Sequence, residues 1–179
     1  MAPRGTIYVF EVDLADSDRS VYESFKINTS MHPSETAVYL LTRVLAYVLE
    51  YREGISFTKG LDEPESPAIQ CLSLDGRITH WIEVGNPSSE KLHRANKIGA
   101  VVSLYSYKRS ELLQEQLNQK GIYNADSIKV TVFPEEMLLT LEQALEKRVR
   151  YQISVVGEVL YIEQNGSTIE IHPHRFHLV

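Results

Sequence analysis

The stretch "PAIQCLSLDGRITHWIEVGNPSSEKLHRANKIGAVVSLYSY", residues 67–107, decides the fold. It opens with two runs, 67–74 and 77–85, that are rich in the apolar, β-branched and aromatic residues typical of strands. Asp75 and Gly76 stand between the runs, and an Asp-Gly pair suits the sharp turn of a β-hairpin. The first part of the stretch therefore predicts two strands joined by a tight turn.

The second part predicts a helix followed by an internal strand. Residues 88–99 begin with Ser88, whose side chain suits a helix cap, and finish at Gly99, a residue common just past a helix end. Residues 100–107 are apolar enough to lie inside a sheet.

The chain before this stretch predicts a longer helix and one more strand. Ser34 or His32, on either side of Pro33, is the start signal of the helix, and Gly54 follows its end. The apolar residues of this helix recur at spacings of three and four: Ala37, Val38, Leu41, Val44, Leu45 and Val48. Residues 55–61 then have strand composition. The expected core is helix, three strands, helix, strand.

Further β-strands are predicted at both ends of the chain. Residues 6–16 and 20–31 alternate like the two strands of a β-hairpin. The pattern after the core predicts a helix at 110–121, a strand at 127–133, a helix at 134–148, and a β-meander from 149 with turns at Gly157 and Asn165-Gly166. No repeat or linker divides the sequence, so we expect one α/β domain over residues 1–179.

Composition narrows the class of protein. The 179 residues are 43% hydrophobic and 23% charged, with a net charge of -6 and an isoelectric point near 5.5. This argues against bulk basic attraction to nucleic acid or membrane, although it allows a local basic patch. The chain shows no signal-peptide pattern and no long apolar run, and its single cysteine, Cys71, reads as a small buried thiol. We expect a cytoplasmic protein with no membrane partner.

Three acidic residues fall in the predicted core. Glu35 is expected in the first turn of the long helix, Glu65 follows Pro64, and Glu83 lies within a strand. A hairpin brings residues 65 and 83 toward each other, and two carboxylates entering one pocket suit a hard cation such as Mg²⁺ or Mn²⁺. Glu65 and Glu83 are therefore candidate metal ligands.

Each acid also has a simpler interpretation. Glu35 near a helix start is favoured by the helix dipole alone, and Glu65 lies in a loop rich in acids that water can solvate. Glu83 shares its strand face with Thr79 and Trp81, so it needs either a partner or a function.

Other constellations are weaker. His172, His174 and His177 resemble a zinc-binding tract, but a proline interrupts them and an exposed tail is the preferred interpretation. No serine-hydrolase elbow, phosphate loop or dinucleotide fingerprint occurs.

Four segments in order resemble the YaeQ family of small bacterial proteins. They are "HPSET" at 32–36, "FTKGL" at 57–61, "EPE" at 63–65 and "WIEVGNP" at 81–87, followed by a helix and "SLYSY" at 103–107. The resemblance runs over essentially the whole chain. It implies a variant of the restriction-endonuclease-like, PD-(D/E)xK nuclease fold, whose core has the predicted order.

The resemblance also assigns roles to residues. It places Pro64-Glu65 at the Pro-Asp of the nuclease motif, Glu83-Val84-Gly85 at (Asp/Glu)-x-Lys, and Glu35 at the helix acid that often completes such sites. Gly85 stands where the motif has lysine.

The missing positive charge has candidate replacements on the following predicted helix. That helix offers Lys91, Arg94 and Lys97, and the spacing of the last two allows both to face the strand. Arg94 is the first choice, because it resembles a position where relatives carry a basic residue. Arginine is a poor general base but a good phosphate ligand. A solvated helix face is the alternative for each of the three.

Two functions remain open. The first is a metal-dependent nuclease in which Glu65 and Glu83 bind Mg²⁺ or Mn²⁺, with Glu35, Arg94 and Lys97 in catalytic roles. The second is a non-catalytic relative of that fold that binds a protein or nucleic-acid partner. The absent lysine favours the second hypothesis, and the three acids favour the first.

Overall fold

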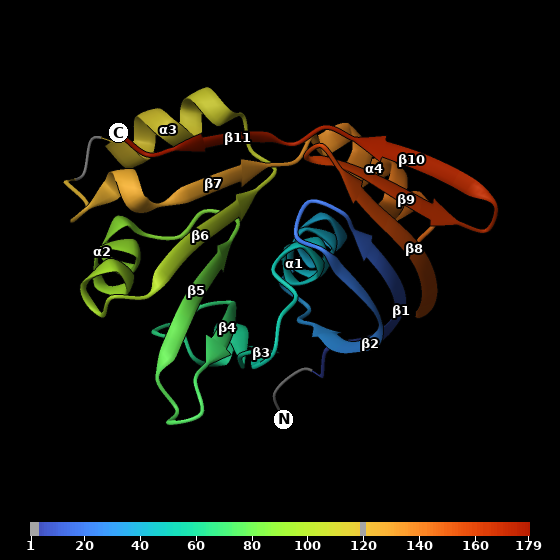
Figure 1. Cartoon of the computed structure of the whole chain (residues 1–179), viewed down its shortest axis with the longest axis horizontal. Coiled ribbons are helices and arrows are strands. Elements are labelled where there is room, and N and C mark those ends of the chain that lie inside the picture. Colours follow the sequence, from blue (N-terminus) through green and yellow to red (C-terminus); the bar gives the residue numbers. More distant parts are fainter. Residues whose placement is uncertain (1–3, 119–120) are drawn as a thin grey trace. The chain divides into compact units, whose positions relative to one another are not determined.

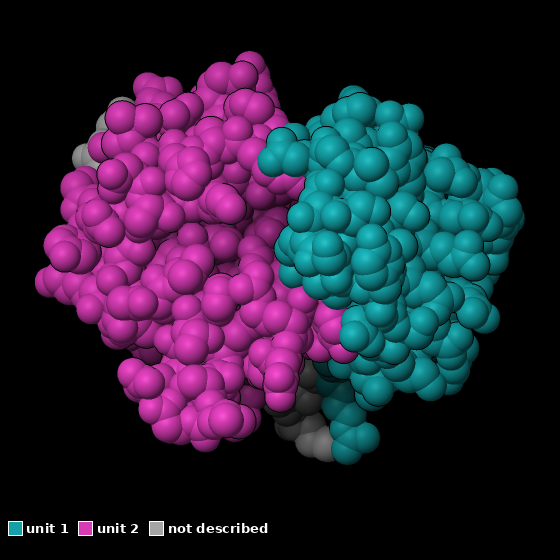
Figure 2. Space-filling view, viewed as in Figure 1, with its two compact units in different colours: residues 1–41, 134–173 teal, residues 42–133, 174–179 magenta. Residues whose placement is uncertain are grey.

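The computed structural model describes residues 4–118 and 121–179 (Figure 1). The chain forms two compact units, coloured separately in Figure 2, and each unit takes its residues from two separate parts of the sequence. Unit 1 comprises residues 1–41 and 134–173, and unit 2 comprises residues 42–133 and 174–179. The expectation of a single domain stays a prediction.

Unit 1 is built on a five-stranded sheet of order β10-β9-β8-β1-β2. Its elements are β1 (Thr6–Asp16), β2 (Val21–Met31), α4 (Glu135–Gln143), β8 (Arg148–Val156), β9 (Val159–Gln164) and β10 (Ser167–Ile171). Strand β1 runs parallel to β8, and the other pairs are antiparallel. The predicted N-terminal hairpin and C-terminal meander are thus confirmed, and they join in one sheet.

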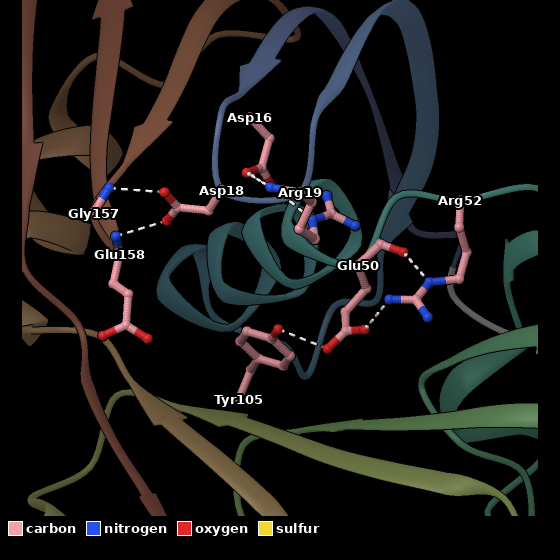
Figure 3. A network of polar contacts seen from close by, with 8 residues as sticks. All are labelled: Asp16, Asp18, Arg19, Glu50, Arg52, Tyr105, Gly157 and Glu158. Atoms are coloured by element: carbon pink, nitrogen blue, oxygen red, sulfur yellow. Dashed lines mark hydrogen bonds and ion pairs between the residues drawn. The ribbon is translucent and has the colours of Figure 1, made fainter.

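Alternation along the strands decides which face of this sheet is buried. Phe10, Val12 and Leu14 of β1 are buried on one face, and every second residue of β8 from Val149 to Val155 is buried as well. A carboxylate in the β1–β2 turn joins this turn to the β8–β9 turn by hydrogen bonds. The Asp18 carboxylate accepts hydrogen bonds of 2.8 and 2.7 Å from the backbone N–H groups of Gly157 and Glu158 in the β8–β9 turn (Figure 3).

Unit 2 is built on a six-stranded sheet of order β11-β7-β6-β5-β4-β3. Its strands are β3 (Ile55–Phe57), β4 (Ile69–Leu72), β5 (Ile78–Val84), β6 (Val101–Ser106), β7 (Lys129–Val132) and β11 (His174–His177). Its helices are α2 (Ser89–Lys97), α3 (Ser110–Asn118) and two short 3-10 turns, η1 (Gly60–Asp62) and η2 (Ala125–Ser127). Strands β5, β6 and β7 are parallel, and β3, β4 and β5 form an antiparallel meander.

One face of the unit 2 sheet carries a hydrophobic core that includes α2 and α3. Trp81 of β5 belongs to this core together with Leu92 and Ala95 of α2 and Val102 and Leu104 of β6. Because side chains alternate along β5, Glu83 points to the same face as Trp81. The packing of α2 therefore brings that helix over the predicted acid.

Helix α1 (Ala37–Leu49) begins in unit 1 and continues in unit 2. Its cap differs from the prediction: the Thr36 side chain accepts the backbone N–H of Tyr39 at 3.1 Å, so neither His32 nor Ser34 starts the helix. Glu35 consequently lies before the helix and not in its first turn. Thr36 caps the helix because the segment around Pro33 forms a turn before it, in which the Glu35 N–H donates to the His32 carbonyl at 2.8 Å.

Three other boundaries depart from expectation. Strand β3 ends at Phe57, and the rest of the predicted strand forms η1. Helix α4 starts after Pro134 as predicted but ends at Gln143, because the chain from Arg148 pairs with β1. The three histidines of the predicted exposed tail, His172, His174 and His177, are exposed, but the segment His174–His177 is a strand, β11, paired with β7. The core order of helix, three strands, helix and strand is confirmed.

Within the described ranges of the chain, none of the helices is long and apolar enough to cross a membrane.

Candidate functional site

Glu83 is a buried carboxylate with two donors on one oxygen. Its side chain is 3% exposed near the end of β5. The indole Nε1–H of Trp81 donates to Oε1 at 2.7 Å, and the ammonium nitrogen of Lys91 lies 3.1 Å from the same atom. Of the two alternatives for Glu83, a partner or a function, the structure shows the partner.

Opposing forces act on this carboxylate. Burial raises the pKa of Glu83, because a desolvated carboxylate is disfavoured, and the Lys91 charge and the Trp81 hydrogen bond act in the opposite direction. Lys91 and the Trp81 indole therefore hold the buried acid in place. An apolar residue at position 83 would fit the core and would need neither partner.

Lys91 comes from the first turn of α2. The Ser88 side chain caps this helix by accepting the Lys91 N–H at 3.2 Å, which confirms the predicted cap. The Lys91 side chain is only 18% exposed. Lys91 lies four residues before Ala95, so Lys91 and Ala95 share one face of α2. Ala95 is buried, and this spacing is the signal that could have favoured Lys91 over Arg94 as the partner of Glu83.

Glu65 and Arg94 form the second ion pair of this site. Glu65 lies in the loop before β4, its side chain is 71% exposed, and its Oε2 pairs with Nη1 of Arg94. Arg94 stands one helical turn after Lys91, so neighbouring cations of α2 pair with the two predicted metal ligands. The structure thus brings Glu65, Glu83 and Arg94 to one helix.

The other two predicted residues have different surroundings. Glu35 closes the turn before α1, where its Oε2 accepts the His32 N–H at 3.3 Å. Its role as a third acid of the site stays a prediction. Lys97 is exposed in the last turn of α2, and no ion pair of Lys97 is found among the described residues.

Sequence reasoning missed a second polar cluster in unit 2. The Tyr105 hydroxyl donates to Oε1 of the buried Glu50 at 2.8 Å, and Nη2 of Arg52 lies 3.1 Å from Oε2 (Figure 3). Another nitrogen of the Arg52 guanidinium contacts Nε2 of His80. These bonds join the end of α1 to β5 and β6. The sequence signal for this cluster was Glu50, an acidic residue that directly follows an apolar helix.

The donor atoms near α2 are of the type that a hard cation prefers. In residues 4–118 and 121–179, no three or more His, Cys, Asp or Glu side chains gather as metal ligands. A Mg²⁺ site can use one or two carboxylates, with water and substrate oxygens completing the octahedron. Glu83 and Glu65 are the two predicted ligands near α2, and each is already paired with a cation of that helix.

The fold and these contacts define a two-unit α/β protein with a buried carboxylate-lysine pair beside its second helix. A model of the family described as "YaeQ protein" matches residues 1–173, and the chain belongs to this family.

Bacterial relatives share nearly the full length of the chain. "Uncharacterized protein YaeQ" of Escherichia coli (strain K12) is 26% identical over 173 residues, 96% of each chain. The protein of the same name in Salmonella typhi is 25% identical over 172 residues, 96% of this chain and 95% of the relative. Both names leave function open.

Solved structures have the same fold. The crystal structure of YaeQ protein from Pseudomonas syringae is 29% identical and superposes with a TM-score of 0.86, covering 98% of this chain and 96% of that one. The crystal structure of YaeQ protein from Xanthomonas axonopodis pv. citri has the same TM-score at 20% identity, with 96% and 97% coverage.

Proposed function

We propose that this protein is a metal-dependent phosphodiesterase acting on nucleic acid, with a variant of the restriction-endonuclease-like site. The observation that carries the proposal is the ion pair between Glu83 and Lys91. The (Asp/Glu)-x-Lys motif needs an acid and an ammonium side by side, and Gly85 cannot supply the ammonium. Lys91 supplies it from α2, at 3.1 Å from the acid.

The arrangement of elements supports the same proposal. The acid stands near the carboxyl end of β5, which is parallel to β6 and β7. Ligands of open α/β sheets bind outside the carboxyl ends of such strands. Helix α2, which follows β5 in the chain, carries Lys91 and Arg94 over this part of the sheet.

Each residue has a defined role in the proposed reaction. Glu83 and Glu65 would hold Mg²⁺ or Mn²⁺, and the cation would lower the pKa of the attacking water. Lys91 stabilises the charge that develops on the scissile phosphate, and in the free protein its charge opposes the effect of burial on the pKa of Glu83. Arg94 is always protonated. It leaves Glu65 and pairs with a substrate phosphate, and so orients the nucleic-acid strand. Lys97 contributes charge at the exposed end of the helix.

The second candidate is a non-catalytic member of this family that binds a protein or nucleic-acid partner. One observation favours it: both predicted metal ligands are already ion-paired, Glu65 with Arg94 and Glu83 with Lys91. A site satisfied in this way keeps its fold without a cation.

Calorimetry with Mn²⁺ separates the two candidates. We expect the wild type to bind Mn²⁺ and Glu83→Gln to lose binding, because the amide has no charge. Glu63→Gln is the matched control, since Glu63 is another acid of the loop and pairs with Lys59 at 3.4 Å. The three proteins are then tested for cleavage of single-stranded, double-stranded and branched DNA and of RNA.

The results discriminate directly. Metal binding and cleavage that both disappear in Glu83→Gln but persist in Glu63→Gln support the enzyme. A wild type that binds no Mn²⁺ at millimolar concentration eliminates the enzyme and leaves the binding module.

A further inference from the structure

The face of the unit 1 sheet that points away from the buried core carries a hollow of about 470 Å³. Strands β2, β1 and β8 form its floor, and they lie side by side in Figure 1. We call it the β1–β2–β8 hollow. A volume of this size is within the usual range of small-molecule sites in proteins.

Strand register arranges the side chains of the β1–β2–β8 hollow in two rows. Taken from β2, β1 and β8 in that order, the first row is Ser24, Asp13 and Gln152, and the second row is Tyr22, Ala15 and Ser154. Asp13 and Ala15 flank Leu14, whose side chain is buried in the core, so both face the hollow. The first row consists of hydrogen-bonding groups, and the second places a small side chain between an aromatic ring and a hydroxyl.

Asp13 is the charged group of the first row, and both of its oxygens are held. The Ser24 hydroxyl donates to Oδ1 at 2.7 Å, and Nη2 of Arg150 donates to Oδ2 at 3.1 Å. The Ser24 hydrogen bond and then the Arg150 hydrogen bond lower the pKa of Asp13, so the group is ionised at neutral pH. Because a carboxylate has about four acceptor sites, Asp13 can still accept hydrogen bonds from a ligand.

Tyr22 provides an exposed aromatic ring in the second row. Its side chain is 62% exposed, and its neighbour across the strand pair is the small Ala15. Such a ring offers a flat apolar surface to a ligand, while the Gln152 amide in the adjoining row can both donate and accept. The hollow therefore combines an aromatic surface with a set of hydrogen-bonding groups.

This lining selects among classes of ligand. An anion is disfavoured, because acidic residues outnumber basic ones in unit 1 by 13 to 6. A cation gains little from Asp13, whose charge Arg150 already balances. A fully apolar ligand would cover the Asp13 carboxylate without replacing its water. A neutral sugar ring suits the lining, since it has a face of C–H groups for Tyr22 and hydroxyl groups for Asp13 and Gln152.

We propose that the β1–β2–β8 hollow is a saccharide-binding site, in which Tyr22 stacks on a pyranose ring and Asp13 accepts hydrogen bonds from its hydroxyl groups. Gln152, Ser24 and Ser154 supply the remaining hydrogen-bonding partners. The site goes beyond the proposed function, because it lies in unit 1 and needs neither a metal ion nor nucleic acid.

The test is an NMR titration of isotope-labelled wild type with three probes, methyl α-glucopyranoside, methyl α-mannopyranoside and methyl α-galactopyranoside. The three differ in the configuration of their hydroxyl groups, and each is added up to decimolar concentration because single sugar rings bind weakly. We expect at least one probe to shift the side-chain amide signals of Gln152 and the backbone amide signals of Ser24 and Ser154 in a saturable way.

Asp13→Asn tests the hydrogen-bonding part of the site. We expect the dissociation constant to rise by about 10-fold, the effect of losing the charge from one charge-assisted hydrogen bond. Glu11→Gln is the matched control, because Glu11 lies two residues earlier on the same face of β1 and pairs with Arg148 at 2.9 Å, as Asp13 pairs with Arg150, but lies outside the hollow.

Tyr22 tests the stacking part and decides the outcome if Asp13→Asn does not fold. Tyr22→Ala removes the ring and should weaken binding by about 10-fold, whereas Tyr22→Phe keeps the ring and should bind like wild type. Urea unfolding verifies that each variant is folded, which the exposure of Tyr22 favours.

The outcomes are distinct. Binding that weakens in Asp13→Asn and Tyr22→Ala but persists in Glu11→Gln and Tyr22→Phe supports the saccharide site. Unchanged signals around the hollow with all three probes overturn it, as do equal effects of Asp13→Asn and Glu11→Gln. Signal shifts with adenosine and with none of the three sugars also overturn it, because the ligand would then be a nucleoside.

Discussion

At the scale of single residues, the Glu83 and Lys91 pair is the most consequential contact. Lys91→Met removes the cation and leaves a buried carboxylate with one donor. We expect a loss of about 3 kcal/mol in the free energy of unfolding, the lower end of the cost of breaking a buried pair, because Lys91 is 18% exposed. Urea denaturation measures this loss.

The double variant Glu83→Gln/Lys91→Met serves as the control. It should recover most of the stability, since no uncompensated charge then remains. Equal losses in the single and double variants would contradict the assignment of Lys91 as the partner of Glu83.

Tyr151 is a second residue whose substitution gives a signed prediction. Its side chain is fully buried in unit 1, and in the described chain its hydroxyl has no hydrogen-bond partner. Burial also raises the pKa of this hydroxyl. We expect Tyr151→Phe to stabilise the protein by about 1 kcal/mol, because a buried unsatisfied polar group is removed without loss of the ring. A lower melting temperature would show that the hydroxyl has a partner in solution.

At the scale of elements, the cluster around Glu50 holds the end of α1 against the sheet of unit 2. Tyr105→Phe removes the 2.8 Å hydrogen bond from β6 to the Glu50 carboxylate. We expect a loss of about 1.5–3 kcal/mol in unfolding free energy, the usual value for a hydrogen bond to a charged group. Tyr107→Phe, two residues later in the chain, is the matched control and should be neutral. Similar losses of unfolding free energy in both variants would show that the loss does not come from the hydrogen bond to Glu50.

His80 makes the same cluster sensitive to pH. The Arg52 guanidinium can only donate, so Nε2 of His80 accepts from it and the ring is neutral with its proton on Nδ1. Burial and the Arg52 charge lower the pKa of His80, and Glu50 acts in the opposite direction.

Because the unfolded chain then binds more protons, stability falls as pH decreases from about 6.5 through the lowered pKa. We expect urea midpoints of wild type to fall more between pH 7.5 and 5.5 than those of His80→Gln, which keeps an acceptor for Arg52. Parallel pH dependence in the two proteins would rule out His80 as the titrating group.

At the scale of the whole molecule, charge is divided unequally between the two units. Unit 1 has 6 basic and 13 acidic residues in its sequence, whereas unit 2 has 12 basic and 11 acidic residues. The net charge of -6 therefore comes from unit 1, whereas unit 2 is close to neutral and would not strongly repel a polyanion. A nucleic-acid partner is expected to use unit 2.

Salt-dependent binding of single-stranded DNA tests this division, with Glu83→Gln as the background to prevent cleavage. Neutralising Lys97 and Lys108 of unit 2 to glutamine should weaken binding and lower the salt slope by about 0.7 for each lost phosphate contact. Neutralising Arg148 and Arg150 of unit 1, which pair with Glu11 and Asp13, should change neither quantity. Equal effects from both pairs would contradict a partner confined to unit 2.

The elements themselves were largely readable from the sequence. Hydrophobic periodicity identified α1, and alternation with turn residues identified the hairpins, because these patterns are local consequences of backbone geometry. Ends that depend on tertiary pairing were not readable. Helix α4 stops early and His174–His177 forms β11 because distant strands offer hydrogen bonds there.

The sequence by itself determined the order of the core and the presence of one anomalous carboxylate, Glu83, in a strand. Only the tertiary structure decided that Lys91 is its cation, that Arg94 pairs with Glu65, and that Glu50 anchors a separate cluster. The physical reason is that a side-chain partner is chosen by the rotation of α2 on the sheet. Buried Leu92 and Ala95 fix that rotation, which the spacing of charges alone does not reveal.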